Sequence, residues 1–430
     1  MVQLKNLLPE GVDTIYGDEY AFKDEIMTNV KNIFRSFGYR QILTPTFEYL
    51  DLYKETFSGI NSKEMFKFIS SEGDIMVLRP DATIPVSRIA AKNYKDNDYY
   101  LKFSYVTNVF RQMEAQKGDR KEFLQGGIEY FGNSKPDCDA EVIAIGIKTL
   151  IDCGIDNLHL DLGQVKYLGS LLEEAEPDED ERKRIIELIE SKNHGELKTY
   201  LANSDLGEQY KKMIYEIPRL YGSPGQILEK ARTYAINDGM VKALDNLEEV
   251  YKILVDYGYD EYIIFDLGFT NPLDYYTGVV FKGYVNNFGK PLIQGGRYDN
   301  LTGKFGAQKP ACGFGMNINN LVEVVNMYQS KESVNCYTDF LVLYKSEFRA
   351  RAIEVSNELR DRGYIVETDS YDQDIRGHLD SANFRNTREI VDICGDIIKV
   401  VNVIKNDVTK VSLNQFMTSV EPESIVLSIH

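Results

Sequence analysis

Three tyrosines and two polar strand residues are the side chains whose types and spacing could do chemistry. Tyr275, Tyr276 and Tyr298 lie in the stretch 265–298, and each phenol offers an apolar ring face and a hydroxyl that donates or accepts a hydrogen bond. Gln125 and Glu129 are four residues apart in a stretch that reads as a strand, so both side chains point to one face. Ordinary half-buried tyrosines and solvent-facing strand residues explain the same pattern, and both alternatives stay open at this point.

The other residues that often do chemistry are dispersed and form none of the common catalytic or metal-binding patterns. Gly303-Lys304 is followed by Phe305, unlike a phosphate-binding P-loop, and Gly313-Phe314-Gly315 lacks the third glycine of a dinucleotide fingerprint. The cysteines form no C-x-x-C pair and the histidines lack H-E-x-x-H spacing. We therefore expect no catalytic residue, no metal and no cofactor. The dispersed residues are Cys138, Cys153, Cys312, Cys336, Cys394, His159, His194, His378 and His430.

Length and charge limit the class of protein further. A chain of 430 residues with 43% hydrophobic residues is expected to form two or three globular domains. The 49 basic and 67 acidic residues give a formal charge of −18, which lowers the odds of a polyanionic partner. The start MVQLKNLLPEGVD lacks a basic, apolar signal, and no uncharged apolar run approaches the 18 residues of a membrane span. We expect a cytoplasmic protein with reduced thiols and no membrane partner.

The periodicity of the first 325 residues predicts an antiparallel sheet flanked by helices. Apolar residues at three and four residue spacing indicate helices, and alternation with turn residues indicates strands and hairpins. The expected elements are a helix at 18–37, a proline-interrupted strand at 39–49, a hairpin at 65–78, a longer hairpin of strands 102–111 and 122–131, a helix at 139–153, a strand at 158–162 and an antiparallel floor at 265–298.

Two further segments differ in character from this core. Residues 173–259 are rich in charge and helical patterns, and we expect a helical insertion within the core domain 1–325. Residues 333–430 alternate between strand and helix patterns, which predicts a small separate α/β domain. Its expected elements are strands at 340–343 and 364–368, a helix at 349–363, and continued alternation at 378–386, 390–393 and 400–403.

Four motifs resemble those of histidyl-tRNA synthetases and of their non-catalytic paralogues, the regulatory subunits of ATP phosphoribosyltransferase. The resemblance implies a class II aminoacyl-tRNA-synthetase-like α+β fold with a degenerate anticodon-binding-like domain at 333–430. Pro45 matches the proline of the motif that builds the dimer interface in class II synthetases, which implies a homodimer. The four motifs are LRPDAT at 78–83, VFRQMEAQKGDRKEFLQGGIEYFG at 109–132, LDYYTGVVF with GGRYD at 273–299, and KPACGFGMNINNL at 309–321.

The resemblance also implies a role for each candidate site residue. Asp81 and Thr83 match the positions that hold the α-amino group of the bound amino acid, and a carboxylate facing an ammonium group is a charge-assisted pair. Arg111 matches the arginine that holds the α-phosphate of ATP. A carboxylate and a tyrosine hydroxyl can satisfy both nitrogens of an imidazole, which fits histidine as the ligand. The residues implied to line the histidine pocket are Gln125, Glu129, Tyr275, Tyr276 and Tyr298.

The positions that would stabilise the transition state of adenylation depart from the synthetase pattern. An Arg-Gly-Leu sequence is replaced by Asn271-Pro272-Leu273, and a Gly-Leu-Glu-Arg sequence is replaced by 317–320, Asn-Ile-Asn-Asn. The glutamate expected after Arg111 is Met113, and Asp119 stands where a basic residue is common. An amide cannot replace a positive charge, and each lost donor typically costs about 3 kcal/mol of transition-state stabilisation. We therefore expect synthetase activity to be lost.

These observations favour a regulatory subunit over a synthetase. The resemblance implies assembly with a short-form ATP phosphoribosyltransferase catalytic subunit, for the first step of histidine biosynthesis, with histidine as the feedback effector and a homodimer within the hetero-oligomer. The net acidic tail domain argues against tRNA binding, because phosphate contacts need lysine and arginine. The alternatives are an atypical histidyl-tRNA synthetase, an ATP-dependent histidine–tRNA ligase, and a synthetase-derived scaffold without an amino-acid ligand.

Overall fold

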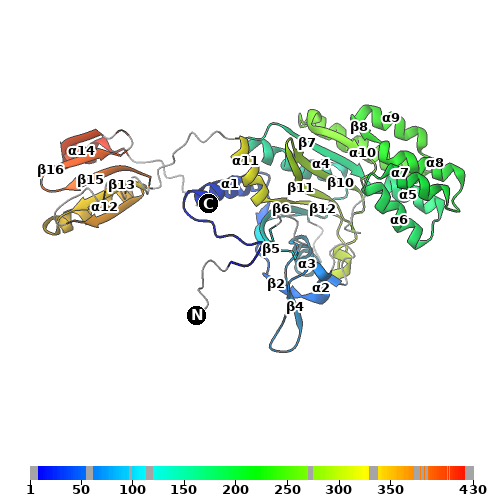
Figure 1. Ribbon diagram of the computed structural model, residues 1–430, viewed down its shortest axis with the longest axis horizontal. Helices are drawn as coiled ribbons and strands as arrows, with labels where there is room; N and C mark the ends of the chain where they lie inside the picture. The colour runs from blue at the N-terminus through cyan, green and yellow to red at the C-terminus, as the bar shows by residue number, and fades with distance from the viewer. Residues whose placement is uncertain are drawn as a thin grey trace. The chain divides into compact units, whose positions relative to one another are not determined.

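The computed structural model divides into two units. Contacts group Met1–Gln329 into the first unit and Ser330–His430 into the second (Figure 1). Within the described residues, no helix is long and apolar enough to cross a membrane. The structure describes residues 8–54, 62–95, 99–112, 120–269, 275–328, 338–371, 378, 382, 386–403, 405 and 407–421.

A nine-stranded sheet forms the centre of the first unit. Its strands are mostly antiparallel, and only the pairs β1–β5 and β7–β9 are parallel. This arrangement confirms the predicted α+β class. In spatial order the strands are β1 (Arg40–Gln41), β5 (Leu101–Phe110), β6 (Glu122–Phe131), β12 (Ala311–Asn317), β11 (Phe288–Arg297), β10 (Val279–Val285), β7 (Leu158–Gln164), β9 (Ile263–Asp266) and β8 (Tyr221–Gly222).

The two hairpins that carry most of the candidate site form as the sequence predicts. Strands β5 and β6 pair over their full length, from Leu101 opposite Phe131 to Phe110 opposite Glu122. Strands β10 and β11 turn at Asn286-Asn287, and Asn287 has a φ of 65°, a left-handed conformation that asparagine tolerates better than most residues. The β10–β11 turn therefore follows the local chemistry of the chain.

Helices cover the two faces of this sheet unequally. The helices α1 (Asp18–Ser36), α4 (Pro136–Asp152), α10 (Asp238–Asp256) and α11 (Ile318–Tyr328) pack on one face and build the large core with Ile128 and Phe314. Helix α3 (Thr83–Asn93) packs on the other face, against Phe103 and Phe131. Glu129 lies between Ile128 and Tyr130 of β6, so alternation turns its side chain toward the α3 face.

Two smaller parts complete the first unit. Strands β2 (Phe47–Tyr49), β4 (Ile75–Leu78) and β3 (Lys67–Ile69) form a separate sheet beside α2 (Leu50–Lys54). Pro45 falls between β1 and β2, as expected for a proline-interrupted strand. Figure 1 shows the helices of the insertion gathered at the β8 end of the large sheet. The helices gathered there are α5 (Val165–Ala175), which precedes the predicted insertion at 173–259, and α6 (Glu179–Glu190), α7 (His194–Ala202), α8 (Glu208–Glu216) and α9 (Pro224–Tyr234), which lie within it. Helix α10 also lies within the insertion.

The second unit is a five-stranded mixed sheet with two described helices on one face. No helix or strand was predicted for residues 405–416, KNDVTKVSLNQF, most of which form β17 and the start of α14. The 378–386 stretch lies almost wholly outside the described residues. The elements in spatial order are β14 (Val366–Ser370), β13 (Thr338–Tyr344), β15 (Thr387–Ile393), β16 (Ile397–Asn402) and β17 (Asp407–Ser412), with α12 (Arg349–Asp361) and α14 (Leu413–Ser419).

Candidate functional site

Glu129 is the centre of the candidate site. Its side chain is 1% exposed, and its two carboxylate oxygens accept hydrogen bonds from Tyr105, at 3.3 Å, and from Tyr298. Burial raises the pKa of Glu129 to about 8, although the hydrogen bonds from Tyr298 and Thr83 oppose this rise. The group is therefore largely protonated at neutral pH while it stays within reach of two phenols.

The neighbouring strand leaves room for this side chain. Gly313 of β12 lies directly opposite Glu129 in the sheet, and a Cβ at that position would come within 1.9 Å of the Glu129 Oε2 atom. Gly127 likewise allows Tyr105 to cross the strand, because a Cβ there would lie 2.4 Å from the Tyr105 hydroxyl. The glycines of β6 and β12 are therefore required by the close approach of the site residues.

Asp81 and Thr83 reach the site from the start of helix α3. The Oδ1 atom of Asp81 accepts the backbone N–H groups of Thr83, at 2.7 Å, and Ile84, at 3.4 Å. Burial raises the pKa of the Asp81 carboxyl, and the positive charge of Arg111 and these amides oppose the rise. Thr83 also hydrogen-bonds Glu129. The two predicted amino-group ligands thus adjoin the predicted imidazole ligand.

The three predicted tyrosines form one aromatic group beside Glu129. The rings of Tyr275 and Tyr276 lie 4.6 Å apart, and those of Tyr275 and Tyr298 meet edge to face at 5.6 Å. Burial raises the pKa of all three phenols, so they remain neutral hydrogen-bonding groups. The edge-to-face geometry is favourable for aromatic pairs, and it fixes the rings around the buried carboxyl.

Gln125 and Arg111 lie further from this centre. Gln125 shares the face of Glu129 as predicted, but four residues along β6 place it about 13 Å away. It packs over Gly315, where a Cβ would be 2.6 Å from its Nε2 atom, and its buried Oε1 atom has no hydrogen-bond partner among the described residues. Arg111 donates to the Pro80 carbonyl at 2.9 Å and stacks over Phe123, so part of its donor capacity is already used.

The asparagines of the motif at 309–321 have structural contacts. Asn319 is buried and accepts the Leu124 backbone N–H at 2.8 Å. Asn317 accepts the Asn320 N–H at 3.1 Å and caps helix α11. The other replaced positions, Asn271, Met113 and Asp119, lie outside the described residues. At the described position 320 a neutral amide therefore stands where the synthetase pattern has an arginine.

Sequence reasoning missed residues that position the site. Tyr105 lies just before the centre of the second motif and was not singled out, and the register of β5 against β6 brings it to Glu129. Arg297 precedes Tyr298 and forms a buried ion pair with Asp139 at 2.8 Å, which holds the end of β11 against α4. The alternating pattern of its strand is the one local signal that could have placed the Tyr105 side chain on the inner face. The Arg297–Asp139 pair gives no local signal, because its two residues are far apart in the chain.

A second arginine fixes the segment that carries Asp81. Arg79 is buried and donates to the Thr44 carbonyl at 2.6 Å, the Pro45 carbonyl at 2.8 Å and the Asn108 carbonyl at 2.7 Å. Its guanidinium therefore joins the proline segment, the end of β5 and the LRPDAT motif. Sequence analysis included this arginine only as a letter of the LRPDAT motif, but its contacts make it a positioning residue.

The arrangement suits a small zwitterion with a polar ring. The Asp81 carboxyl and the Thr83 hydroxyl can receive an ammonium group, and Glu129 with the tyrosine hydroxyls can bond both nitrogens of an imidazole. Among the described residues, no group of three or more histidine, cysteine or acidic side chains is placed to bind a metal. The chemistry that these groups support is binding of an amino acid.

The comparisons with known proteins identify the family and the fold. The family model described as Histidyl-tRNA synthetase matches residues 11–321. A histidyl-tRNA synthetase structure from Nostoc is similar in fold, with a TM-score of 0.80 at 19% identity over 97% of this chain and 99% of its own. The fold and the site thus define a class II, histidyl-tRNA-synthetase-like protein.

Closer relatives distinguish between the branches of that class. A protein from Acetivibrio thermocellus named ATP phosphoribosyltransferase regulatory subunit is 35% identical over 97% of this chain and 100% of its own. One of the same name from Ruminiclostridium cellulolyticum is 38% identical over 86% of this chain and 87% of its own. A solved structure from Bacillus halodurans, described as an ATP phosphoribosyltransferase regulatory subunit/histidyl-tRNA synthetase, has a TM-score of 0.80 at 31% identity, covering 90% and 97% of the two chains.

The chain belongs to the family of ATP phosphoribosyltransferase regulatory subunits. These names confirm the prediction of a regulatory subunit and of a synthetase-like fold.

Proposed function

We propose that this chain regulates a separate ATP phosphoribosyltransferase catalytic subunit by binding histidine at the Glu129 site. The catalytic subunit would carry out the first step of histidine biosynthesis, and histidine would act as the feedback effector. The observation that carries the proposal is the buried Glu129 carboxyl, held by Tyr298 and Tyr105 next to Asp81 and Thr83. These groups complement the two polar ends of histidine.

Feedback requires that histidine bind two states of the assembly with different affinity. If histidine favours the less active state, one coupling free energy links its site to the catalytic subunit. The loss of arginine at Asn320, together with the replacement at Asn271, supports a site used for binding rather than for adenylation. Arg111 would then be a residual phosphate-site residue.

The proposal is tested in the reconstituted complex with the short-form catalytic subunit. Phosphoribosyl-ATP formation is measured over a histidine titration for the wild type, Tyr276→Phe and Tyr284→Phe. We expect the Tyr276→Phe variant to need about tenfold more histidine for half inhibition, since a lost hydrogen bond weakens binding by up to about 1.4 kcal/mol. Tyr284 stacks on His159 outside the site, so its variant should behave as the wild type. Equal inhibition of all three proteins would remove Tyr276 from the sensing role.

The atypical synthetase remains the second candidate, because the binding side of the site matches its pattern. It is separated by ATP–pyrophosphate exchange in the presence of histidine. We expect no exchange above the rate without protein, and robust exchange would favour the synthetase. The absence of histidine binding altogether would favour the scaffold without an amino-acid ligand.

We further propose that the chain forms a homodimer through the sheet β2–β4–β3. Large apolar side chains are exposed there and just before it, with Leu43 at 83%, Ile69 at 74% and Phe47 at 55%. Exposed apolar residues gathered in this way are typical of protein interfaces. Light scattering should show a dimer for the wild type and for Ile397→Glu, which alters an exposed residue of the second unit, and a monomer for Ile69→Glu. A dimeric Ile69→Glu variant would argue against this surface.

We also propose a domain assignment for each of the two parts of the chain. Residues 1–325 would form the synthetase-like core with its insertion, and residues 333–430 a degenerate anticodon-binding-like domain without a tRNA partner. The net negative charge of the chain supports the second assignment. The dispersed cysteines, three of which are buried as free thiols, support a reducing cytoplasmic location.

A further inference from the structure

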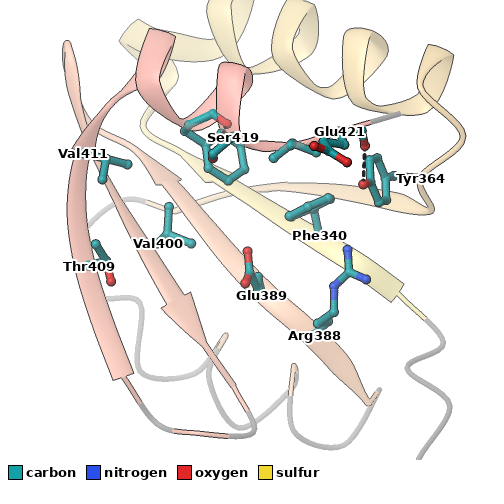
Figure 2. Close-up of a pocket in the computed structure, with 11 residues that line it drawn as sticks. Phe340, Tyr364, Arg388, Glu389, Val400, Thr409, Val411, Ser419 and Glu421 are labelled. Carbon is teal, nitrogen blue, oxygen red and sulfur yellow. Dashed lines mark hydrogen bonds between the residues drawn. The ribbon is translucent and has the colours of Figure 1, made fainter. Parts of the chain in front are cut away.

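The second unit has an open groove in which polar and apolar side chains are mixed. The groove has a volume of ≈ 520 Å³ and lies between the strands β13, β15, β16 and β17 and the end of helix α14 (Figure 2). Two of its aromatic residues, Phe340 and Phe416, are buried in the core beneath it. The surface that remains comes from half-buried valines and a tyrosine, exposed hydroxyl side chains and charged groups. These residues are Val400, Val411, Val420, Tyr364, Thr409, Ser419, Arg388, Glu389 and Glu421.

Arg388 is the basic residue of the described lining, and its charge is already balanced. Its guanidinium lies 5.3 Å from the centre of the Phe340 ring and 5.5 Å from that of the Tyr364 ring. Its Nη1 atom also pairs with Asp339 at 3.2 Å. Because the arginine is both stacked and paired, it does not present an unpaired positive charge to an anionic ligand.

Glu389 brings an unbalanced negative charge to the strands that form the floor of the groove. It lies opposite Phe340 of β13 and Asn402 of β16, so its side chain points to the face that carries α12 and α14. Figure 2 shows its carboxyl between Val400 and Arg388. This half-buried carboxyl forms no hydrogen bond or ion pair with any residue that the structure describes. A carboxylate that is partly removed from water in this way favours a cationic partner.

The surroundings of Glu389 fit a side chain with an aliphatic stem and a cationic head. Val400 and Val411 present methyl groups to the groove, and Thr409, directly opposite Val400 in the sheet, presents a hydroxyl. Lysine and arginine bury their stems along apolar surface while the charged head stays with a polar group. A head that reaches Glu389 forms a charge-assisted pair, and the Thr409 hydroxyl can accept a further N–H. A purely apolar side chain would leave the carboxylate desolvated and unpaired.

We propose that this groove is a docking site for a lysine or arginine side chain of the catalytic subunit, and that Glu389 receives its charge. Because the partner is the catalytic subunit, this inference rests on the proposed function. The chain has a formal charge of −18, so long-range attraction favours a basic surface of another protein over a second copy of this acidic chain. The second unit then contributes to assembly without a tRNA partner.

Binding of the full-length chain to the short-form catalytic subunit, measured by surface plasmon resonance, tests this docking site. Glu389→Arg should weaken the complex about tenfold or more, because it replaces attraction by repulsion at a half-buried position. Glu389→Gln keeps the size of the side chain and should weaken the complex less. Glu354→Arg is the control, since Glu354 is exposed on α12, its carboxyl pairs with no other described residue and it does not line the groove. Added salt should reduce the difference between the wild type and Glu389→Arg, since it screens the charges.

The outcomes separate a failure of the docking site from a failure of the proposed function. If the wild type binds the catalytic subunit and Glu389→Arg binds equally well, the docking site is overturned and the proposed function stands. Equal losses in Glu389→Arg and Glu354→Arg would also overturn it, because they would reflect net charge rather than the groove. A wild type that does not bind the catalytic subunit would overturn both. Thermal unfolding checks that each variant is folded, and if Glu389→Arg is not, unchanged binding of folded Glu389→Gln would overturn the docking site and weakened binding would support it.

Discussion

Replacing Glu129 by glutamine should change how the stability of the protein depends on pH. The pKa of Glu129 is about 8 in the folded protein, against an ordinary value of 4.5. Between these two pH values the unfolded chain releases the proton that the folded chain keeps. The folded state therefore loses stability as the pH rises from 4.5 to 8. Glutamine stays neutral throughout and removes this contribution.

The magnitude follows from the difference between the two pKa values. A difference of 8 − 4.5, about 3.5 units, at 1.36 kcal/mol per unit gives a contribution of about 5 kcal/mol that is present at pH 4.5 and lost by pH 8. The pKa of Asp81 is also raised, so its contribution has the same sign. The Asp81 contribution is present in both the wild type and Glu129→Gln. The difference between their unfolding free energies therefore reports the contribution of Glu129.

The assay is denaturant unfolding of the wild type and Glu129→Gln at several pH values from 5 to 9. We expect the unfolding free energy of the wild type to fall more steeply with rising pH, and the two curves to separate by up to about 5 kcal/mol. Glu72→Gln, in an exposed turn, should follow the wild type. Parallel curves for Glu129→Gln and the wild type would refute the argument that burial keeps this carboxyl protonated.

Two further substitutions test the surroundings of the site by thermal or denaturant unfolding. Gly313→Ala should destabilise the protein by about 1–3 kcal/mol or more and abolish histidine binding, because the added Cβ would clash with Glu129. Gly283→Ala is the control, since its Cβ would lie at an ordinary 3.5 Å from Ile293. Equal stability of the two variants would contradict the close approach of Glu129 to Gly313. Arg297→Met should cost about 3–5 kcal/mol, since it leaves a buried carboxyl unpaired. Arg351→Met removes an exposed pair and should cost at most about 1 kcal/mol; similar losses for the two would contradict the positioning role of Arg297.

The sequence was informative where short-range chemistry decides the structure. Alternation placed Gln125 and Glu129 on one face, and the pattern of 265–298 predicted the antiparallel pairing of β10 and β11, because strand geometry is a local property. The motifs also identified Asp81 and Thr83 beside Glu129, and the structure brings these residues together.

The rest depends on contacts between distant parts of the chain. Tyr105 meets Glu129 only through the register of two strands, and the Arg297–Asp139 pair spans 158 residues. On the same face, Gln125 lies about 13 Å from Glu129 along β6. In the second unit, β17 and α14 were missed because the polar residues of an edge strand and a short helix give weak periodic signals.

Calorimetric titration of the purified protein with histidine tests the central claim most directly. The account predicts saturable binding of one histidine per chain in the wild type, and weakened binding in Glu129→Gln, without ATP being required. A flat titration of the wild-type protein, or binding that is unchanged by Glu129→Gln, would contradict a histidine site built around this carboxyl.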